Sequence, residues 1–193
     1  MTFIKQFPVQ SPADMKWRIL PELELTPALE ASIQQMLIAA FPDYEDFFST
    51  HSYWGSTPEF RLIALENDTP VAHLEFGYRT ITVNEMPFMI AGIGAVAIHP
   101  SHQGRKLGKV MFFHLREHLL QNTRVDFGFI GCHDEVVGFY KAAGFTRVHQ
   151  SVYNLNPDSL TWETFHGPTL ILPIHRSLDQ WKDGLIHLHG MPW

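Results

Sequence analysis

Residues 88–132 constrain the fold most, because they read as strand, tight loop, helix and strand in immediate succession. Residues 88–98 carry no charge and are rich in small and β-branched side chains, which predicts a strand buried on both faces. His99-Pro100 ends that strand, because proline removes a ladder donor. Residues 125–131 predict the second strand, after a helix with an apolar stripe at Leu107, Met111, Leu115 and Leu119. The stretch therefore predicts an α/β (α+β) protein in which a helix connects two strands of one sheet.

The loop before that helix, Gln103-Gly104-Arg105-Lys106-Leu107-Gly108, suits an anion. Glycine lets the backbone approach a ligand closely, and the first turn of a helix has unpaired N–H groups and a positive dipole end. Arg105, Lys106 and Lys109 add positive charge at the same place. A pyrophosphate fits this combination, while an ordinary turn with solvated lysines accounts for the same residues.

Two segments of the chain resemble motifs of the GCN5-related N-acetyltransferases. The loop is similar to their Gln/Arg-x-x-Gly-x-Gly/Ala pyrophosphate motif, except that Lys106 replaces the first glycine of that motif. Residues 138–145, Gly-Phe-Tyr-Lys-Ala-Ala-Gly-Phe, resemble the family's Phe-Tyr-x-x-x-Gly-Phe segment. The resemblance implies a single mixed, mostly antiparallel sheet of seven core strands, with splayed central parallel strands and helices on both faces. We expect an N-terminal arm over residues 1–15, a single acyltransferase domain over residues 16–193, and closing strands at 147–155 and 169–174.

The same resemblance implies an acyl-CoA donor, with acetyl-CoA as the first expectation. In this family, backbone groups at the end of the strand before the loop hold the pantetheine arm, a role that falls here to Val96, Ala97 and Ile98. The pyrophosphate is expected to lie on loop residues Gln103, Gly104, Arg105, Lys106, Leu107, Gly108 and Lys109. His133 stands where many members have asparagine, which makes it a further candidate for donor binding.

Acyl transfer from a thioester to an amine requires a neutral amine, a stabilised oxyanion and a proton for the leaving thiolate. Tyr140 is the candidate acid, because a phenol with a pKa of about 10 can protonate a forming thiolate. The alternative for Tyr140 is an aromatic residue that only packs a helix on the sheet.

The candidate bases lie on a neighbouring strand. Many family members carry a glutamate before the loop, but Ile93-Gly94-Ala95-Val96 has none. His73 and Glu75 alternate within the predicted strand 71–81 and therefore share a face. We expect His73 first and Glu75 second, with His133 and Glu135 as further candidates; a polar pair on a solvent-facing strand is the alternative.

The acceptor is inferred from a second resemblance. Residues 52–61, 71–73 and 173–184 resemble nodulation protein A, and residues 71–73, 172–174 and 192–193 resemble aminoglycoside 2′-N-acetyltransferases. Both families act on amino-sugar amines, which implies an amino-sugar-like or polycationic small molecule as substrate. Candidate acceptor residues are Asp43, Asp46, Trp54 and Trp193, although a surface helix whose aromatic residues cover the core also explains residues 43–53. Two alternative functions stay open: long-chain N-acylation of an amino-sugar oligomer, and non-catalytic binding of acyl-CoA.

Composition excludes several other classes. The chain of 193 residues has a net charge of −6 and no Lys/Arg run, which argues against nucleic acid and anionic membranes as partners. Its one cysteine, Cys132, rules out an internal disulfide, and no stretch approaches the roughly 20 apolar residues of a membrane span. We expect a cytoplasmic protein without a metal, since His187-x-His189 is not an established ligand spacing. The sequence leaves the oligomeric state open, and a homodimer is compatible with it.

Overall fold

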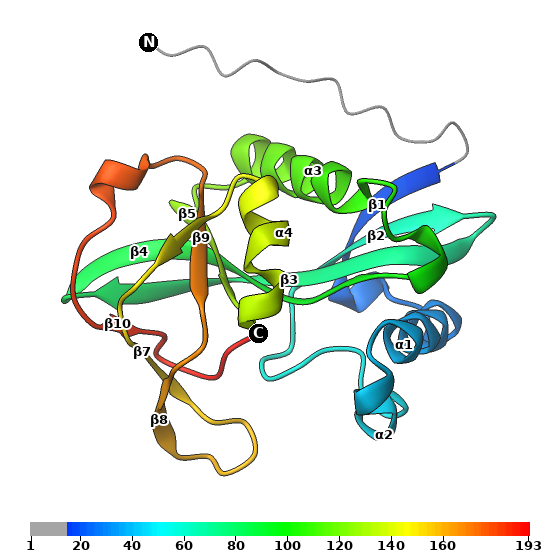
Figure 1. Ribbon diagram of the computed structural model, residues 1–193, viewed down its shortest axis with the longest axis horizontal. Coiled ribbons are helices and arrows are strands. Elements are labelled where there is room, and N and C mark those ends of the chain that lie inside the picture. The colour runs from blue at the N-terminus through cyan, green and yellow to red at the C-terminus, as the bar shows by residue number, and fades with distance from the viewer. Residues whose placement is uncertain (1–14) are drawn as a thin grey trace.

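The computed structural model describes residues 15–193 (Figure 1). Most of the expected N-terminal arm, residues 1–14, lies outside the described residues, whereas Met15 already belongs to the first strand. Within residues 15–193, no helix is long and apolar enough to cross a membrane.

The described chain is built on one mixed sheet. The strand order is β6-β9-β5-β4-β3-β10-β7-β8, and β2 pairs with β3 and with β1. Of the strand pairs, β4–β5 and β10–β7 are parallel, and the others are antiparallel. The expected mixed, mostly antiparallel sheet is therefore confirmed, with ten strands in place of seven. They are β1 Met15–Pro21, β2 Phe60–Glu66, β3 Thr69–Val83, β4 Met86–Ile98, β5 Phe127–Gly131, β6 Thr146–Val148, β7 Val152–Leu155, β8 Trp162–Phe165, β9 Thr169–Pro173 and β10 Ile186–His187.

Helices cover both faces of the sheet, as expected. In Figure 1, α3 (Leu107–Asn122) lies above the long strands, and α1 (Pro27–Ala40) and α2 (Glu45–Phe48) lie below them. The apolar stripe predicted for α3 is buried against the sheet, together with residues of α4 (Val137–Ala142). Thr26 caps α1 by accepting a hydrogen bond from the Leu29 N–H. Apolar burial on each face therefore fixes the sheet between the two helix layers.

The two parallel strands at the centre separate part-way along their length. β4 and β5 pair only through Ile90–Phe127, Ala91–Gly128 and Gly92–Phe129. β4 continues for six more residues, to Ile98, without β5 beside it. The register of β3 on β4 shifts between His73 and Glu75, and Ala95, in that stretch of β4, has a positive φ of 41°. The expected splay is thus present, with a bulge in β4 just beyond its last pair with β5.

Two strand boundaries differ from the sequence prediction. β5 begins at Phe127 rather than Val125; just before it, the Asp126 carboxylate accepts a hydrogen bond from the Met89 N–H and pairs with Arg176. The predicted strand 147–155 is two short strands: β6 pairs with β9, whereas β7 pairs with β8 and β10. Alternation of apolar residues cannot reveal this break, since a chain that leaves one edge of the sheet and joins another keeps the same pattern.

Candidate active site

The glycine-containing loop reaches the first turn of α3 through left-handed backbone. Gly104 has a φ of +76° and Lys106, the residue before the helix, has a φ of 61° and a ψ of 17°. Glycine adopts this conformation without steric cost, which explains why a glycine stands at the Lys106 position in the resembling motif. Lys106 adopts this left-handed conformation at a steric cost that glycine avoids.

The loop is fixed to the strand before it and to α4. The Gln103 side-chain amide donates to the Ile98 carbonyl at 3.2 Å. A Cβ at Gly108 would lie 2.2 Å from the Phe139 ring, so Gly108 is needed for the packing of α3 on α4. Arg105, Lys106 and Lys109 are exposed at the start of α3. These cations surround a helix N-terminus, which is an environment that attracts anions.

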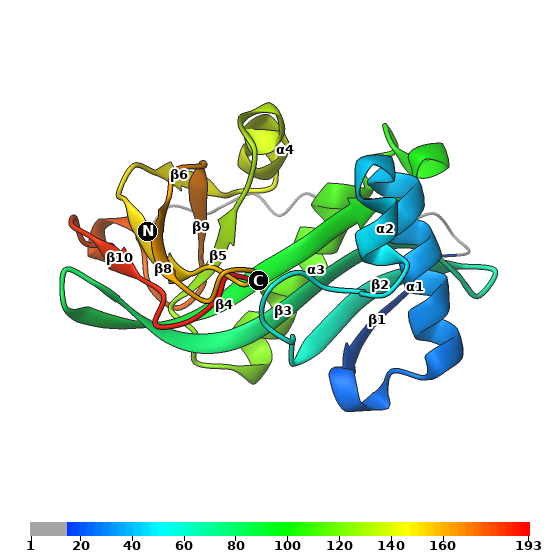
Figure 2. The same cartoon turned by 90° about the horizontal axis from the view of Figure 1, so that it is seen from below.

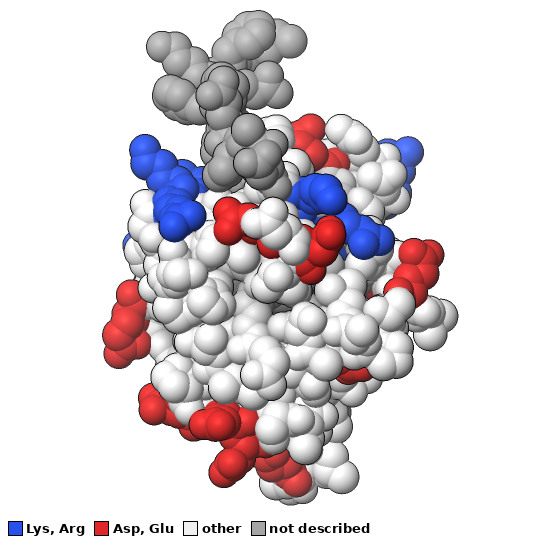
Figure 3. Space-filling model, turned by 90° about the vertical axis from the view of Figure 1, so that its right-hand side faces the viewer, with Lys and Arg blue, Asp and Glu red and all other residues white. Residues whose placement is uncertain are grey.

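The lower part of the face at the right of Figure 1 is acidic. Figure 3 shows a group of carboxylates at its lower edge, on the side where Figure 1 places α2, while the upper part of the view carries Lys and Arg together with further carboxylates. Asp43, in the turn before α2, and Asp46, in α2, are the predicted acceptor carboxylates, and both are exposed. They lie apart from the buried polar groups described next.

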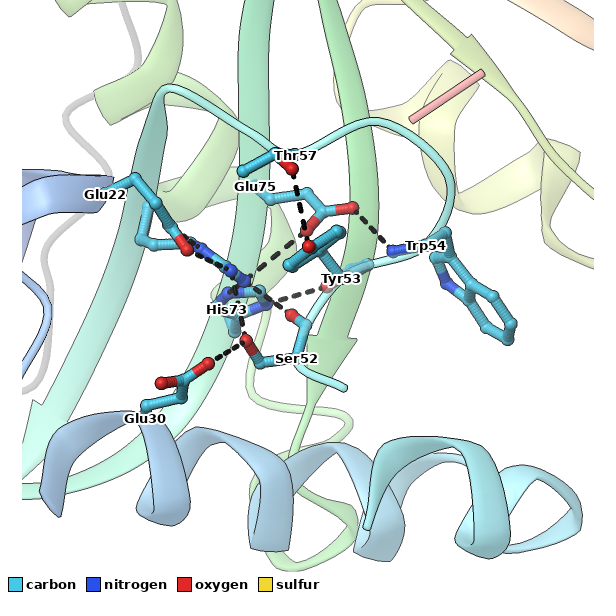
Figure 4. A network of polar contacts seen from close by, with 10 residues as sticks. Glu22, Glu30, Ser52, Tyr53, Trp54, Thr57, His73 and Glu75 are labelled. Atoms are coloured by element: carbon cyan, nitrogen blue, oxygen red, sulfur yellow. Dashed lines mark hydrogen bonds and ion pairs between the residues drawn. The ribbon is translucent and has the colours of Figure 1, made fainter. Parts of the chain in front are cut away.

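A buried polar network centres on Arg61 of β2 (Figure 4). Its guanidinium binds Glu22 through Nε at 2.6 Å and Nη2 at 2.9 Å, a bidentate pair. It also donates to the carbonyl and the hydroxyl of Ser52, and Nη1 lies 3.4 Å from Glu75 Oε2. Arg61 therefore connects three parts of the chain from inside the protein: the segment directly after β1, the loop after α2, and β3.

His73, the first expected base, is fully buried in this network. Its Nδ1 donates to the Ala95 carbonyl at 2.9 Å, because a carbonyl can only accept. The other ring nitrogen, Nε2, faces Arg61 Nη1 at 3.3 Å and so accepts. Burial, followed by the charge of Arg61, lowers the pKa of His73 to about 3. Both ring nitrogens are engaged, so the geometry favours a structural role for this side chain.

Glu75 occupies the next position on the same face. Its Oε1 accepts a hydrogen bond from the Trp54 N–H at 3.2 Å, and the carboxylate lies against Gly94, whose Cβ would be 2.5 Å from that oxygen. Burial raises the pKa of Glu75 to about 8, against the opposing charge of Arg61. A carboxylate with such a pKa takes up and releases a proton near neutral pH, which suits acid–base chemistry.

Tyr140 is buried on α4, among the rings of Phe112, Phe139 and Phe145. Burial raises its pKa, and the neighbouring Cys132 thiol adds to this. The phenol therefore keeps its proton at neutral pH, as a general acid must. His133 and Glu135, the further candidates from the sequence, are exposed in the turn before α4.

The two tryptophans predicted for the acceptor site lie on either side of Glu75. The Trp54 indole stacks on Phe47 of α2 with ring centroids 4.7 Å apart, and the Trp54 backbone N–H donates to Glu75 Oε1. Trp193 packs on the glycines of β4: a Cβ at Gly92 would lie 2.0 Å from the indole, and one at Gly94 2.6 Å from the Trp193 backbone. The structure thus brings Trp54, Glu75 and Trp193 together, whereas Asp43 and Asp46 stay at the surface.

Arg61, Ser52 and Glu22 are absent from the sequence prediction, although the network depends on them. The available signal was Arg61 itself, a charged residue in the otherwise apolar Phe60–Leu65 stretch. Such a residue is buried only with partners, which a single sequence does not identify.

The His187 and His189 rings stack on each other with centroids 4.1 Å apart. The part of the chain that the structure describes holds no cluster of three metal-ligating side chains.

Comparison with known proteins identifies the family. The model of the nodulation protein A family matches residues 12–190. The chain belongs to the nodulation protein A family. Among its relatives, nodulation protein A of Mesorhizobium sp. strain 7653R is 29% identical over 88% of this chain and 93% of its own length. The protein of Rhizobium sp. strain N33 is 24% identical over 90% and 95%.

Solved structures share the fold of this chain. The N-acetyltransferase YhbS from Escherichia coli, determined in complex with CoA, superposes with a TM-score of 0.60 at 14% identity, over 93% of both chains. Tetrahymena GCN5 gives 0.58 at 14% identity, over 85% of this chain and 99% of its own. The fold is that of the GCN5-related N-acetyltransferases. As a member of the nodulation protein A family with this fold, the chain is an acyl-CoA-dependent N-acyltransferase.

Proposed function

We propose that this enzyme transfers a short acyl group, acetyl first, from acyl-CoA to a primary amine of an amino-sugar-like molecule, with Glu75 as base and Tyr140 as acid. The observation that carries the proposal is the position of Glu75. Its carboxylate is buried against Gly94, in the part of β4 that has separated from β5.

The donor fits the chain along β4 and the loop after it. Beyond Gly92 the edge of β4 has no β5 beside it, so the backbone of Val96, Ala97 and Ile98 can hydrogen-bond the amides of a pantetheine arm. Loop residues Gln103 to Lys109 then meet the pyrophosphate with cations and helix N–H groups. His133, exposed near α4, is at most a peripheral contact of the donor.

The reaction requires two proton transfers. As the amine nitrogen forms its bond to the thioester carbonyl, its proton passes to Glu75, which must be ionised to accept it. When the C–S bond breaks, Tyr140 supplies a proton to the thiolate; the proton on Glu75 then returns to solvent and Tyr140 regains one from solvent, which restores both groups. His73 takes no part, because its accepting nitrogen faces Arg61 and its pKa is far below neutral.

The acceptor is proposed to approach from the side of Trp54 and the acidic residues of α2. The Trp54 backbone N–H contacts Glu75 while its indole packs on Phe47, and exposed Asp43 and Asp46 attract a positively charged molecule towards that side. The amino-sugar assignment is supported by family membership and by the net charge of −6. A cytoplasmic location agrees with use of a CoA thioester.

Titration with acetyl-CoA, followed by thiol release with aminoglycosides, glucosamine oligomers and polyamines, tests the proposal. We expect acetyl-CoA to bind and one amine class to drive thiol release. Tyr140→Phe should retain donor binding and lose turnover. If Tyr140→Phe turns over like the wild type, its proposed role as acid is overturned, and if neither acetyl-CoA nor longer acyl-CoAs bind, the donor site is overturned. Binding without turnover on any amine would favour the alternative of a non-catalytic acyl-CoA-binding module.

A further inference from the structure

We propose that Glu59 and the indole N–H of Trp193 form a subsite that binds a hydroxyl group of the acceptor, next to the proposed base Glu75. The inference rests on the proposed function, because it takes the reacting amine to lie at Glu75. It goes beyond that proposal by naming a second group of the acceptor that the enzyme recognises, and the two residues that recognise it.

Glu59 lies directly before β2 and extends the pairing of that strand with β3. The two strands are antiparallel, with Arg61 opposite Glu75, and the Glu59 N–H donates to the Phe76 carbonyl at 3.2 Å. Glu59 therefore stands opposite Gly77, on the face of the sheet that carries Glu75. Glu75 is completely buried, whereas Glu59 is exposed. This face thus leads from the proposed base to solvent over two residues of β3, or about 7 Å.

The Glu59 carboxylate rests on the backbone of Gly77. A Cβ at Gly77 would collide with Glu59 Oε2, so a glycine is needed there to leave room for the carboxylate. Oε2 also accepts a hydrogen bond from the Tyr78 N–H at 3.1 Å, which fixes its position. Among residues 15–193, no ion pair involves Glu59 and no donor reaches its Oε1. One oxygen of an oriented carboxylate can therefore accept from a ligand.

Arg79, on the same face of β3, is held by other groups. Its Nη1 donates to the Met191 carbonyl at 2.6 Å, and its Nη2 donates to the Ser56 hydroxyl at 2.8 Å. The guanidinium lies over the Trp193 ring, 4.2 Å from the ring centroid. Figures 1 and 2 both show this end of the chain beside the loop that leads from α2 to β2. Arg79 therefore holds the indole in place and leaves the Glu59 carboxylate without an ion pair.

The Trp193 indole places a donor beside this carboxylate. Its Nε1 lies 3.2 Å from the position of a Cβ at Gly77, the same position that Glu59 Oε2 approaches. In the part of the chain that the structure describes, this N–H donates to no acceptor. A ligand group that contacts both residues must donate to the carboxylate and accept from the N–H. A hydroxyl does both, whereas an ammonium group has no acceptor atom, so the pair selects a hydroxyl.

The subsite narrows the class of acceptor. Gly77 is two residues from Glu75 along β3, so a hydroxyl bound over it lies about 7 Å from the base. That hydroxyl belongs to the sugar that carries the amine or to the sugar next to it. Polyamines have no such group. The subsite therefore favours hydroxylated amines, and positive charge alone does not determine which acceptor is used.

The experiment measures dissociation constants of the glucosamine dimer and of cyclohexylamine for the CoA-saturated protein by NMR titration, so that it needs no turnover. Cyclohexylamine has a six-membered ring and an amine but no hydroxyl. For the glucosamine dimer, we expect Glu59→Ala to raise the dissociation constant at least about fivefold. Trp193→Phe, which keeps a ring but loses the N–H, should raise it about two- to fivefold. Glu59→Gln keeps an oxygen that accepts from a hydroxyl and should raise it about twofold or less.

Two controls accompany these variants. Cyclohexylamine should bind each of them as it binds the wild type. Glu117→Gln, on α3, is the matched control, because α3 covers the opposite face of the sheet, and it should bind the glucosamine dimer as the wild type does.

The outcomes separate the inference from the proposed function. Unchanged binding of the glucosamine dimer by Glu59→Ala overturns the inference. Equal weakening by Glu59→Gln and Glu59→Ala also overturns it, because an ammonium group rather than a hydroxyl would then be bound. In both cases thiol release by the wild type still supports the transferase. Absence of thiol release with every amine overturns the proposed function instead, while the dissociation constants still decide whether the subsite exists.

Discussion

Arg61 Nη1 and Glu75 Oε2 lie 3.4 Å apart, and both side chains are completely buried. The same guanidinium holds Glu22 and the loop at Ser52, so the carboxylate proposed as base is positioned by contacts that reach three separate parts of the chain. Arg61 also limits the rise in the pKa of Glu75 that burial causes. The network therefore connects stability and proton transfer through one residue.

Arg61→Met should be strongly destabilising, because it leaves two carboxylates without their buried partner. We expect the free energy of unfolding to fall by about 3–5 kcal/mol, measured by urea denaturation. Lys16→Met removes the exposed partner of Asp68 and serves as the control, with a change of about 0.5 kcal/mol or less. A loss below about 1 kcal/mol for Arg61→Met would show that the network is dispensable for the fold.

Glu75→Gln should abolish turnover while leaving donor binding intact. The amide keeps the shape of the side chain but cannot accept a proton, so we expect thiol release to fall by about 10²–10⁴-fold. The wild-type rate should rise with pH towards about 8, as Glu75 ionises, and this limb should disappear in the variant. Glu24→Gln, at an exposed glutamate, is the control and should behave as the wild type. If the rate of Glu75→Gln still rises with pH towards about 8, another group is responsible for that pH dependence.

His73 should make the protein sensitive to acid. Its pKa is about 3 in the folded protein and 6.5 otherwise, so between pH 6.5 and about pH 3 the unfolded chain binds the proton and the folded chain does not. The free energy of unfolding should therefore fall with decreasing pH, by at most about 1.4 kcal/mol per unit. Glu75 acts in the opposite sense between pH 4.5 and 8, because its raised pKa favours the folded state while it is protonated.

The contribution of His73 is isolated by comparison with His73→Asn, which keeps a donor for the Ala95 carbonyl. The difference in unfolding free energy between wild type and variant should be constant above pH 6.5 and should shrink as pH falls. A pH-independent difference would mean that His73 is protonated in the folded protein as well.

The central fold could be predicted because its signals are local. The uncharged strand before His99 and the apolar stripe from Leu107 to Leu119 each depend on a short stretch of sequence, and both predictions are confirmed. The break between β6 and β7 could not be predicted, since strand pairing depends on distant partners.

The site was predicted less completely, because its contacts also depend on residues that are distant in the sequence. Periodicity indicated that His73 and Glu75 share a strand face, but not that Arg61 lies between them and that the face is buried. Which of two neighbouring groups can act as a base depends on what faces it from other strands. Chain order also gave no indication that Trp193 lies on Gly92, about one hundred residues earlier in the sequence.

Lys106→Gly should separate the conformational and electrostatic roles of the loop. Lys106 has a φ of 61°, which costs an L-residue about 1–2 kcal/mol, whereas glycine adopts it freely but loses more entropy on folding. We expect the free energy of unfolding to rise by about 0.5 kcal/mol, while acyl-CoA binding weakens about two- to fivefold through the lost charge. Lys109→Ala, at a helical position in the same turn, should weaken binding to a similar extent without the gain in stability. A lower free energy of unfolding for Lys106→Gly would mean that the left-handed conformation of Lys106 carries no strain. Unchanged acyl-CoA binding by this variant would mean that the Lys106 charge does not contact the donor.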